Sequence, residues 1–439
     1  MASPIDTEMT SCTCHHKKAF VGIDMGATHA GISCITYVDC QACGKKHDKV
    51  RHHTLVNKFP VLLAYAYDSS RPAFRFVETK GNLYHHETAL SNFKLLLPEM
   101  DSYQNQCHTE AIIQYINKTT LDVATHHGHG IVVEMVKKYL DGLINLMLEK
   151  MAETAPGILK EDMKIILTYP KFFQSSTGEA FTLLSQAIDL LDMQGILSID
   201  KLPEHSAALK ASLYFAGGDL WRHQMANAWV VVADCGGMTI DAVLYRIPAP
   251  NTAEDTTQFH QLSSSLGGGV WVDQAIDMYA RQHLRTWPGG HDYSLFEMRV
   301  QQVMDHWHRV IKPEFEPDDR LPALALGNGL FFEYPRDVII KAFNDVIEII
   351  YNAVSELWHA RGLNGMHPKG LILSGGLAQQ EYLKDQLLEK LRRKIDRNLN
   401  IIPEIPQDSW NWVASGAALS GLSSTSLFSH SAEYAGLGN

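Results

Sequence analysis

Two stretches far apart in the chain follow one plan and decide the expected fold. They read FVGIDMGATHAGISCITYV over residues 20–38 and VVVADCGGMTIDAVLYRI over residues 230–247. In each, an apolar run ends in Asp-x-Gly, a turn with threonine follows, and a second run is rich in β-branched and aromatic residues. Such runs around a glycine turn are typical of β-hairpins. The repeat predicts a duplicated α/β core with one phosphate-binding loop in each half.

Helical spacing and short apolar strands surround the two hairpins. Apolar residues three and four apart from Val132 to Met147 predict a long helix before a strand at 164–170. We expect further helices at 179–193, 273–284, 297–311, 338–357 and 382–391, strands at 196–199, 258–263 and 371–376, and loops at 248–257 and 314–319. The halves are assigned to residues 1–225 and 226–439, with inserted subdomains near 59–130 and 271–335.

The composition excludes several classes of protein. A chain of 439 residues with 45% hydrophobic residues can form more than one core, and a net charge of -11 argues against nucleic acid or an anionic membrane as partner. The polar start, residues 1–18, lacks the apolar stretch of a secretory signal, and no run of about 18 apolar residues could span a bilayer. We therefore expect a cytoplasmic protein. The 22 histidines and seven unevenly placed cysteines are the unusual counts.

The glycine turns carry residues suited to a ligand that contains phosphate and a metal ion. Backbone amides in such turns can cradle phosphate oxygens, and a threonine hydroxyl can add a donor. Asp24 and Asp234 can hold hydrated Mg²⁺, which prefers a few carboxylates and several waters. Two such loops that face one another would hold a triphosphate from both sides. A third glycine turn, at 374–378, can approach a flat ligand such as adenine or ribose.

Four motifs in order resemble those of one superfamily. They are GIDMGATH at 22–29, ADCGGMTID at 233–241, LILSGGLAQQEYL at 371–383 and WVASGAAL at 412–419. They resemble the phosphate-1, phosphate-2, adenosine and second connecting motifs of the actin, hexokinase and heat-shock-70 ATPases. WHRVIKPEF at 307–315, Cys235 and the pair Phe93-Lys94 make the chain most similar to the nucleotide-binding domain of divergent heat-shock-70-like proteins of fungi and animals.

This resemblance covers about residues 18–424 and implies a fold. The fold is a duplicated actin-like, ribonuclease H-like α/β architecture of two lobes around a central nucleotide cleft. Each lobe would have a mixed five-stranded sheet and an inserted subdomain. The implied cofactor is ATP or ADP with Mg²⁺.

The resemblance also implies site residues. Asp24 and Asp234 would hold Mg²⁺ through water, Lys94 would reach the γ-phosphate, and Glu204 or Asp234 would orient the attacking water. A solvated helix lysine is the alternative interpretation of Lys94. The catalytic candidates are Asp24, Asp234, Glu204, Lys94, His29 and His205, the two histidines being expected beside the cleft or as satisfied loop residues. The nucleotide-contacting candidates are Gly26, Ala27, Thr28, Gly236, Gly237, Met238, Thr239, Gly268, Gly269, Lys312, Gly375, Gly376 and Leu377.

Some positions depart from the family pattern. Ala27 removes a donor from the first loop, and Met238 stands where the second loop normally has its third glycine. The first connecting motif, Glu-Pro-x-Ala-Ala, aligns with Leu202 in place of its acid, and Trp410 or Asn411 replaces an acid near the ribose. The retained aspartates favour binding of a metal–nucleotide complex, while the changed positions predict slow or absent hydrolysis.

Four cysteines form a separate candidate metal site. Cys12-x-Cys14 precedes the first hairpin strand, and Cys40-x-x-Cys43-Gly follows the second. The CxxC-Gly form is typical of zinc knuckles, and tetrahedral Zn²⁺ needs four such ligands near one point. An antiparallel hairpin brings the start of its first strand beside the end of its second. We therefore predict a structural Zn²⁺ site, with free thiols or a redox pair as the alternative.

The expected function is a heat-shock-70-like ATP-binding protein, with slow Mg-dependent ATP hydrolysis left open. The chain ends at Asn439, soon after the last motif, so we expect either a stand-alone domain without a peptide-binding domain or a part of a longer protein. Two alternatives stay open: an enzyme recruited to act on another small molecule, for example in specialised metabolism, or a non-hydrolysing pseudo-ATPase scaffold. The expected partner is a nucleotide or another small molecule in the cleft, and a protein partner is left open.

Overall fold

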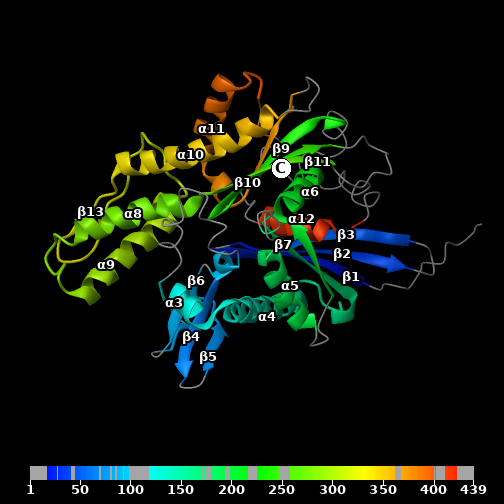
Figure 1. The fold of residues 1–439 in the computed structure, drawn as a ribbon, viewed down its shortest axis with the longest axis horizontal. Helices are drawn as coiled ribbons and strands as arrows, with labels where there is room; N and C mark the ends of the chain where they lie inside the picture. Colours follow the sequence, from blue (N-terminus) through cyan, green and yellow to red (C-terminus); the bar gives the residue numbers. More distant parts are fainter. Residues whose placement is uncertain are drawn as a thin grey trace, which may run out of the picture.

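The protein is a mixed α/β structure with several sheets, and helices pack on the faces of the two larger sheets (Figure 1). The computed structural model describes residues 17–26, 28–40, 45–68, 71–79, 82–84, 87–91, 93–97, 118–170, 173, 179–192, 198–215, 225–247, 258–360, 367–399, 401 and 411–422. None of the helices in these ranges combines the length and apolar character that a membrane crossing needs.

The first sheet is built around the first predicted hairpin. Its strand order is β3-β2-β1-β7-β8, formed by β1 (Lys17–Met25), β2 (His29–Cys40), β3 (Lys45–Pro60), β7 (Met163–Tyr169) and β8 (Ser198–Pro203). β1 and β2 are antiparallel, with Lys17 opposite Val38, while β7 is parallel to β1 and to β8. The hairpin and the mixed five-stranded sheet are confirmed. The long strand β3 was not anticipated.

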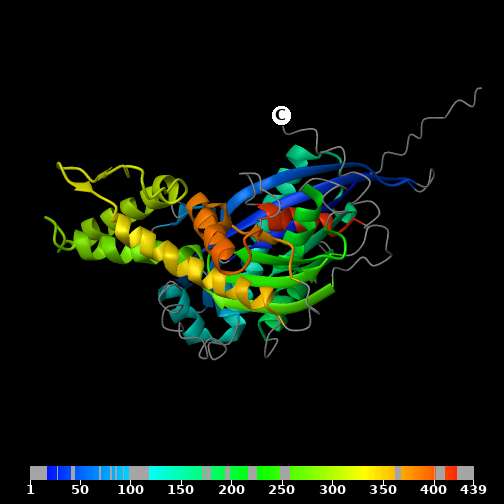
Figure 2. The ribbon, with the colours of Figure 1, turned by 90° about the horizontal axis from the view of Figure 1, so that it is seen from above.

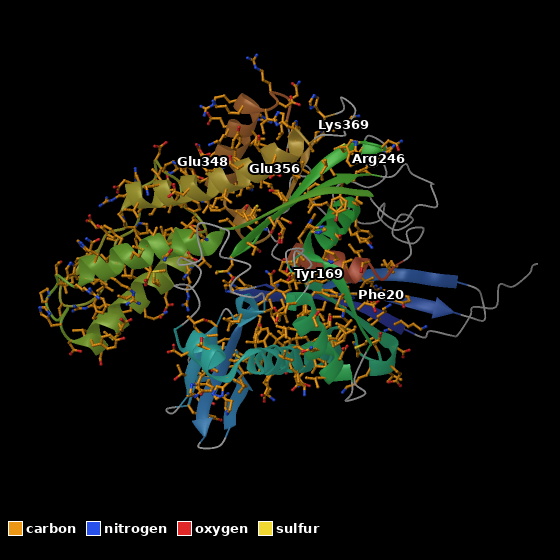
Figure 3. The ribbon with its side chains drawn as sticks, in the orientation of Figure 1. Phe20, Tyr169, Arg246, Glu348, Glu356 and Lys369 are labelled. Carbon is orange, nitrogen blue, oxygen red and sulfur yellow. The ribbon has the colours of Figure 1, made fainter. Side chains whose placement is uncertain are left out.

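The second sheet repeats this arrangement around the second hairpin. Its order is β11-β10-β9-β14, formed by β9 (Trp229–Cys235), β10 (Thr239–Arg246), β11 (Gln258–Leu266) and β14 (Leu371–Ser374). β9 and β10 are antiparallel, and β14 is parallel to β9. The predicted five strands are corrected to four in the described ranges, with one isolated bridge from Leu371 to Ile401 at the β14 edge. Arg246 and Lys369 lie at the end of this sheet away from the hairpin turn (Figure 3).

Layers of helices alternate with the two sheets (Figures 1 and 2). α4 (His129–Thr154) and α5 (Glu179–Asp192) pack on one face of the first sheet, and α10 (Arg336–Trp358) covers one face of the second, with α11 (Glu381–Lys394) packed on α10. α6 (Glu204–Phe215) and α12 (Trp412–Leu419) lie between the sheets. Both faces of β9 are therefore buried, since Val231 joins one core and Val230 the other. Burial on both faces explains its continuous apolar sequence.

The small residues of WVASGAAL allow α12 to fit between β1 and α6. A Cβ at Gly22 of β1 would lie 1.9 Å from the Ala414 carbonyl oxygen, and a Cβ at Gly416 would lie 1.8 Å from the Ala207 carbonyl oxygen of α6. The chain division at 225/226 placed α12 with the second half. The helix packs on α6 and on β1 and β2 of the first sheet.

Two smaller units are formed by residues 62–127 and 269–332. The first has a three-stranded sheet, β5-β4-β6, with two helical segments: β4 (Leu62–Asp68), β5 (Arg71–Phe76), β6 (Thr88–Ser91), the 3-10 turn η2 (Phe93–Leu96) and α3 (Lys118–His127). The second has two helices, a π-helical turn and a short hairpin: α8 (Gly269–Leu284), α9 (Tyr293–His306), the turn η5 (Trp307–Ile311), β12 (Leu324–Ala325) and β13 (Phe331–Phe332). The helices predicted at 273–284 and 297–311 are thus confirmed, the second ending in a π-helical turn. The remaining short turns are η3 (Lys160–Asp162) and η6 (Leu377–Gln379).

Candidate functional site

The two hairpin turns meet at a cavity of about 1680 Å³. They are in contact, because a Cβ at Gly237 would lie only 2.6 Å from Thr28 Oγ1. The start of α8 braces the second turn: the Gly269 N–H donates to the Gly236 carbonyl at 3.2 Å. Gly268 has a φ of 148°, and its Cβ would meet the same carbonyl at 2.6 Å. This position therefore requires glycine, both for its backbone angle and for its space.

A hydroxyl group holds each of the two hairpin aspartates. Thr168 Oγ1 donates to Asp24 Oδ1 at 2.8 Å, and Ser374 Oγ donates to Asp234 Oδ1 at 2.8 Å. Thr168 lies on β7 and Ser374 on β14, the strands parallel to β1 and β9, so the two sheets repeat this pairing. The sequence interpretation missed both hydroxyls. Their signal was a Thr or Ser at the end of each buried strand KIILTYP and LILSGG.

Lys94 and Glu204 form a buried ion pair in the cavity. Lys94 Nζ lies 2.8 Å from Glu204 Oε1 and also donates to the Met25 carbonyl oxygen. Their exposed fractions are only 2% and 6%, so the interpretation of Lys94 as a solvated lysine is wrong. The motif alignment put the acid position at Leu202. That residue lies on β8 and packs against a hydrophobic core, whereas Glu204 begins α6 and lines the cavity.

Glu204 also allows a second alignment of the first connecting motif. The run Glu204-His205-Ser206-Ala207-Ala208 matches the Glu-Pro-x-Ala-Ala pattern with histidine in place of proline. This register moves the acid two residues along the chain from Leu202. Glu204, and not Leu202, therefore lines the cavity.

Burial and mutual repulsion shift the pKa values of the carboxylic acids at the cavity. The pKa of Asp234 is raised to about 7 by burial and then by the charge of Asp24. The pKa of Glu204 is raised to about 8 by burial and by both aspartates, against the opposing effect of Lys94. Burial also raises the pKa of Asp24, while Lys94 and Thr168 act in the other direction. One lysine thus faces three carboxylic acids.

Asp241 is a further buried acid that the sequence interpretation did not single out. It lies directly opposite Asp234 in the β9–β10 pairing, and Ser264 Oγ donates to its Oδ1. Its Oδ2 is buried and has no hydrogen-bond partner within the described part of the chain. Burial raises its pKa to about 6.

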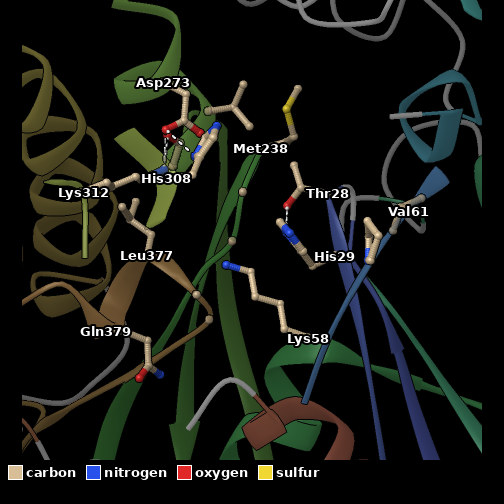
Figure 4. A pocket seen from close by; sticks show the side chains of 18 of the residues that line it. Thr28, His29, Lys58, Val61, Met238, Asp273, His308, Lys312, Leu377 and Gln379 are labelled. Carbon is tan, nitrogen blue, oxygen red and sulfur yellow. Dashed lines mark hydrogen bonds and ion pairs between the residues drawn. The ribbon is translucent and has the colours of Figure 1, made fainter. Parts of the chain in front are cut away.

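A second polar cluster lies around Asp273 of α8 (Figure 4). Asp273 Oδ1 accepts from Lys312 Nζ at 2.7 Å and from Trp307 Nε1 at 2.8 Å, and it lies 3.7 Å from His308 Nδ1. Lys312 Nζ also donates to the Gly269 carbonyl at 2.8 Å. Lys312, a candidate for contact with adenine or ribose, therefore lines the cavity with its charge already paired. The acid of this pair was not predicted from the sequence.

The two candidate histidines differ in position. His29 lines the cavity, with Nδ1 3.2 Å from Thr28 Oγ1. Burial and then the nearby Lys58 lower its pKa to about 3. His205 is not among the residues that line the cavity, and its Nδ1 lies 2.5 Å from the Tyr245 hydroxyl. Its place on α6, one residue after Glu204, turns the ring toward β10.

Most of the remaining candidates line the cavity. These are Gly26, Thr28, Gly236, Gly237, Met238, Thr239, Gly269, Gly375, Gly376 and Leu377. Met238 is 2% exposed and packs with the core of the first sheet, so its side chain joins the second turn to the first half. Gly375, with a φ of 89°, approaches Asp234 closely, because its Cβ would lie 2.9 Å from Asp234 Oδ1.

The zinc prediction falls largely on residues outside the described ranges. Cys12, Cys14 and Cys43 lie outside them, as do Ala27 and Trp410, and Cys40 is the last residue of β2. The antiparallel pairing of β1 and β2 agrees with the geometric premise of the site. The site itself stays a prediction.

Stability should fall as pH rises above about 6.5. Asp234 and Glu204 have folded-state pKa values of about 7 and about 8, above their unfolded values, so the folded protein holds protons that the unfolded chain has released. Their stabilising contribution is lost as pH rises through those values. His29 and His52, with pKa values lowered to about 3 and about 4, act in the opposite direction only below about 6.5. Urea unfolding should show a loss of about 1–3 kcal/mol between pH 6.5 and 8.

The variant Asp234→Asn should flatten this pH dependence. The exposed Asp345→Asn, on α10, should leave it unchanged. Parallel curves for the wild type and Asp234→Asn would contradict the assignment.

The chain matches no protein-family model and no curated protein sequence. Evidence for a function therefore comes from the α/β fold, the paired turns and the cavity. The resemblance to heat-shock-70-like proteins stays a hypothesis that depends on four motifs in order.

Proposed function

We propose that this protein binds a nucleotide together with Mg²⁺ in the cavity between its two hairpin turns. In this proposal the chain has the two-lobed, actin-like fold of the heat-shock-70-like ATPases. The observation that carries the proposal is that Asp24 and Asp234, on equivalent strands of two similarly ordered sheets, line one cavity at turns that touch. A duplicated pair of glycine turns suits a ligand held by its phosphates from both sides.

The electrostatics of the cavity favour a cation. Asp24, Asp234 and Glu204 have raised pKa values because they are buried near one another, and a divalent ion would stabilise their charged forms. Within the described ranges, no three His, Cys, Asp or Glu side chains are grouped closely enough to ligate a metal directly. The proposal therefore concerns a hydrated Mg²⁺, held through its waters, which would neutralise phosphate charge when bound.

Different residues of the cavity would contact different parts of the nucleotide. Thr28 and Thr239 offer hydroxyls at the turns, and Lys94 places a positive charge beside Glu204. The third glycine turn, at 375–377, lines the same cavity and would lie against the nucleoside. Glu204 would orient a water for hydrolysis, but its carboxylate is engaged by Lys94. We therefore expect slow turnover, since phosphoryl transfer depends mainly on positioning and charge stabilisation.

Calorimetry with ADP and ATP, with and without Mg²⁺, tests the proposal. We expect nucleotide binding that is tighter with Mg²⁺. Asp234→Asn should remove most of the effect of Mg²⁺ and weaken Mg-nucleotide binding by about tenfold or more, because a charge-assisted contact to the hydrated ion is lost. Asp345→Asn, an exposed acid in an ion pair with Lys341, is the matched control. No detectable heat at millimolar nucleotide would exclude nucleotide binding and favour a different small molecule in the cavity.

Phosphate release separates a slow ATPase from a pseudo-ATPase. A slow ATPase should release phosphate in single-turnover experiments and lose that release with Glu204→Gln, while keeping nucleotide affinity. Binding without release, unchanged by Glu204→Gln, would support a non-hydrolysing scaffold. Met238, which fills space at the second turn, is the observation that favours this second function.

A further inference from the structure

Basic side chains from both sides of the cavity converge near the Asp273 cluster (Figure 4). His29 and Lys58 come from β2 and β3 of the first sheet, and His308 and Lys312 come from the π-helical turn and the residue after it. All four line the cavity, and Figure 4 shows the Lys58 side chain extending toward the space between them. Lys58, His308 and Lys312 lie outside the glycine turns, and His29 directly follows the first turn. The metal–nucleotide contacts proposed above use none of the four.

Several basic groups face one another in this group. Asp273 Oδ1 already accepts hydrogen bonds from Lys312 and Trp307. The pKa of Lys58 is lowered by burial and then by Lys312, and the pKa of His29 is lowered by burial and then by Lys58. The basic groups thus repel one another across the cavity. The negative charge of Asp273 acts in the opposite direction, because it raises the pKa of Lys58. An anion placed between them would relieve the repulsion.

We propose that Lys58, Lys312, His29 and His308 form an anion subsite that binds one oxyanion group of the ligand, a phosphate or a carboxylate. Lys58 is the central residue, since it reaches into the cavity from the side opposite Lys312 (Figure 4). A bound oxyanion would join the two sides of the cavity through charge-assisted hydrogen bonds. The identity of the rest of the ligand rests on the proposed function, but the subsite can be tested with simple anions.

Proton uptake is a specific consequence. His29 is faced by Lys58, His308, Lys312 and Asp273. His308 is faced by Asp273, Lys312, Lys58 and Asp305. The pKa values of both rings are lowered in the free protein, first by burial. A bound anion raises these values, so binding takes up protons and tightens as pH falls.

The experiment titrates the full chain with inorganic tripolyphosphate and, separately, with citrate, both in EDTA. Calorimetry in two buffers of different ionisation enthalpy measures affinity and proton uptake together. We expect binding of at least one anion with net proton uptake at pH 6, and the two arms distinguish phosphate from carboxylate. Lys58→Gln should weaken binding by about 10- to 100-fold, while Lys58→Arg should keep most of the affinity. Lys341→Gln, which removes an exposed lysine on α10, is the matched control.

Three results would overturn the proposal: no binding of either anion at millimolar concentration, equal affinity in Lys58→Gln and the wild type, or equal loss in Lys58→Gln and Lys341→Gln. If His29→Gln and His308→Gln take up as many protons on binding as the wild type, the two histidines are not part of the subsite. Thermal melts of each variant check its fold. Anion binding that depends on Lys58 without any Mg-nucleotide binding would keep the subsite and reject the proposed function. If Mg-nucleotide binding depends on Asp234 but the affinity for anions is unchanged in Lys58→Gln, the proposed function is kept and the subsite is rejected.

Discussion

Gly416→Ala is expected to destabilise the fold by about 3 kcal/mol or more, or to prevent folding. The new Cβ would lie 1.8 Å from the Ala207 carbonyl oxygen and 2.5 Å from its carbonyl carbon. Both atoms belong to the backbone of α6, so no side chain can rotate away to make room. α12 cannot retreat from α6 either, because its other side is in contact with Gly22 of β1. Relief requires that a whole helix move between the two sheets.

Thermal and urea unfolding of the purified variant measure this effect. Gly130→Ala is the matched control, because Gly130 lies in α4 with no atom within 4 Å of its built Cβ. This change should be neutral or stabilise by up to about 1 kcal/mol, since alanine is the better helix former. If Gly416→Ala unfolds like Gly130→Ala, the tight contact of α12 with α6 is wrong. Gly22→Ala, on the other side of α12, should repeat the loss.

Lys94→Met should reduce the free energy of unfolding by about 3–5 kcal/mol near pH 8. Lys94 is 2% exposed and is the cation paired with Glu204, beside Asp24 and Asp234. Methionine keeps much of the side-chain volume but leaves these acids without their opposing charge. The loss should be smaller at pH 6, because the raised pKa of Glu204, about 8, lets that acid take up a proton. Urea unfolding at the two pH values checks both the size and the pH dependence.

The double variant Lys94→Met/Glu204→Gln identifies the cause of this loss. Removing the negative charge together with its partner should recover part of the stability, and the difference from additivity measures the coupling. Lys164→Met is the control, since Lys164 forms a half-exposed ion pair with Asp200 on the neighbouring strand β8 and should contribute little. A loss that is equal at both pH values and unaffected by Glu204→Gln would show that packing alone is responsible.

Local patterns were sufficient for most of the secondary structure. Alternating or continuous apolar residues identified both hairpins, and helical spacing identified α4, α8 and α10. These signals work because each depends on residues close together in the chain. The sheet of the first insertion, β4 to β6, had no comparable signal. Its short strands derive their stability from packing with α3 and α4 rather than from their own pattern.

The site was only partly accessible from the sequence. Asp24 and Asp234 could be named because each follows a buried strand at a glycine turn. The acid of the first connecting motif was placed at Leu202, since a motif with one substitution can be aligned in two registers. In the fold, Glu204 begins a helix and meets Lys94, a residue 110 positions away, which supports the second register. Lys58 drew no attention because it lies in no motif, and His308 lies in WHRVIKPEF but was not singled out there.

The sequence by itself determined that this protein is α/β, that it contains a repeated hairpin with Asp at the end of its first strand, and that WVASGAAL forms a helix. Only the tertiary structure decided that this helix packs on the first sheet, that His205 turns toward Tyr245, and that one lysine faces three acids. The physical reason is the separation along the chain of the residues that interact. A turn or a helix depends on neighbours along the chain, whereas burial, pairing and charge repulsion depend on residues that only the complete fold brings together.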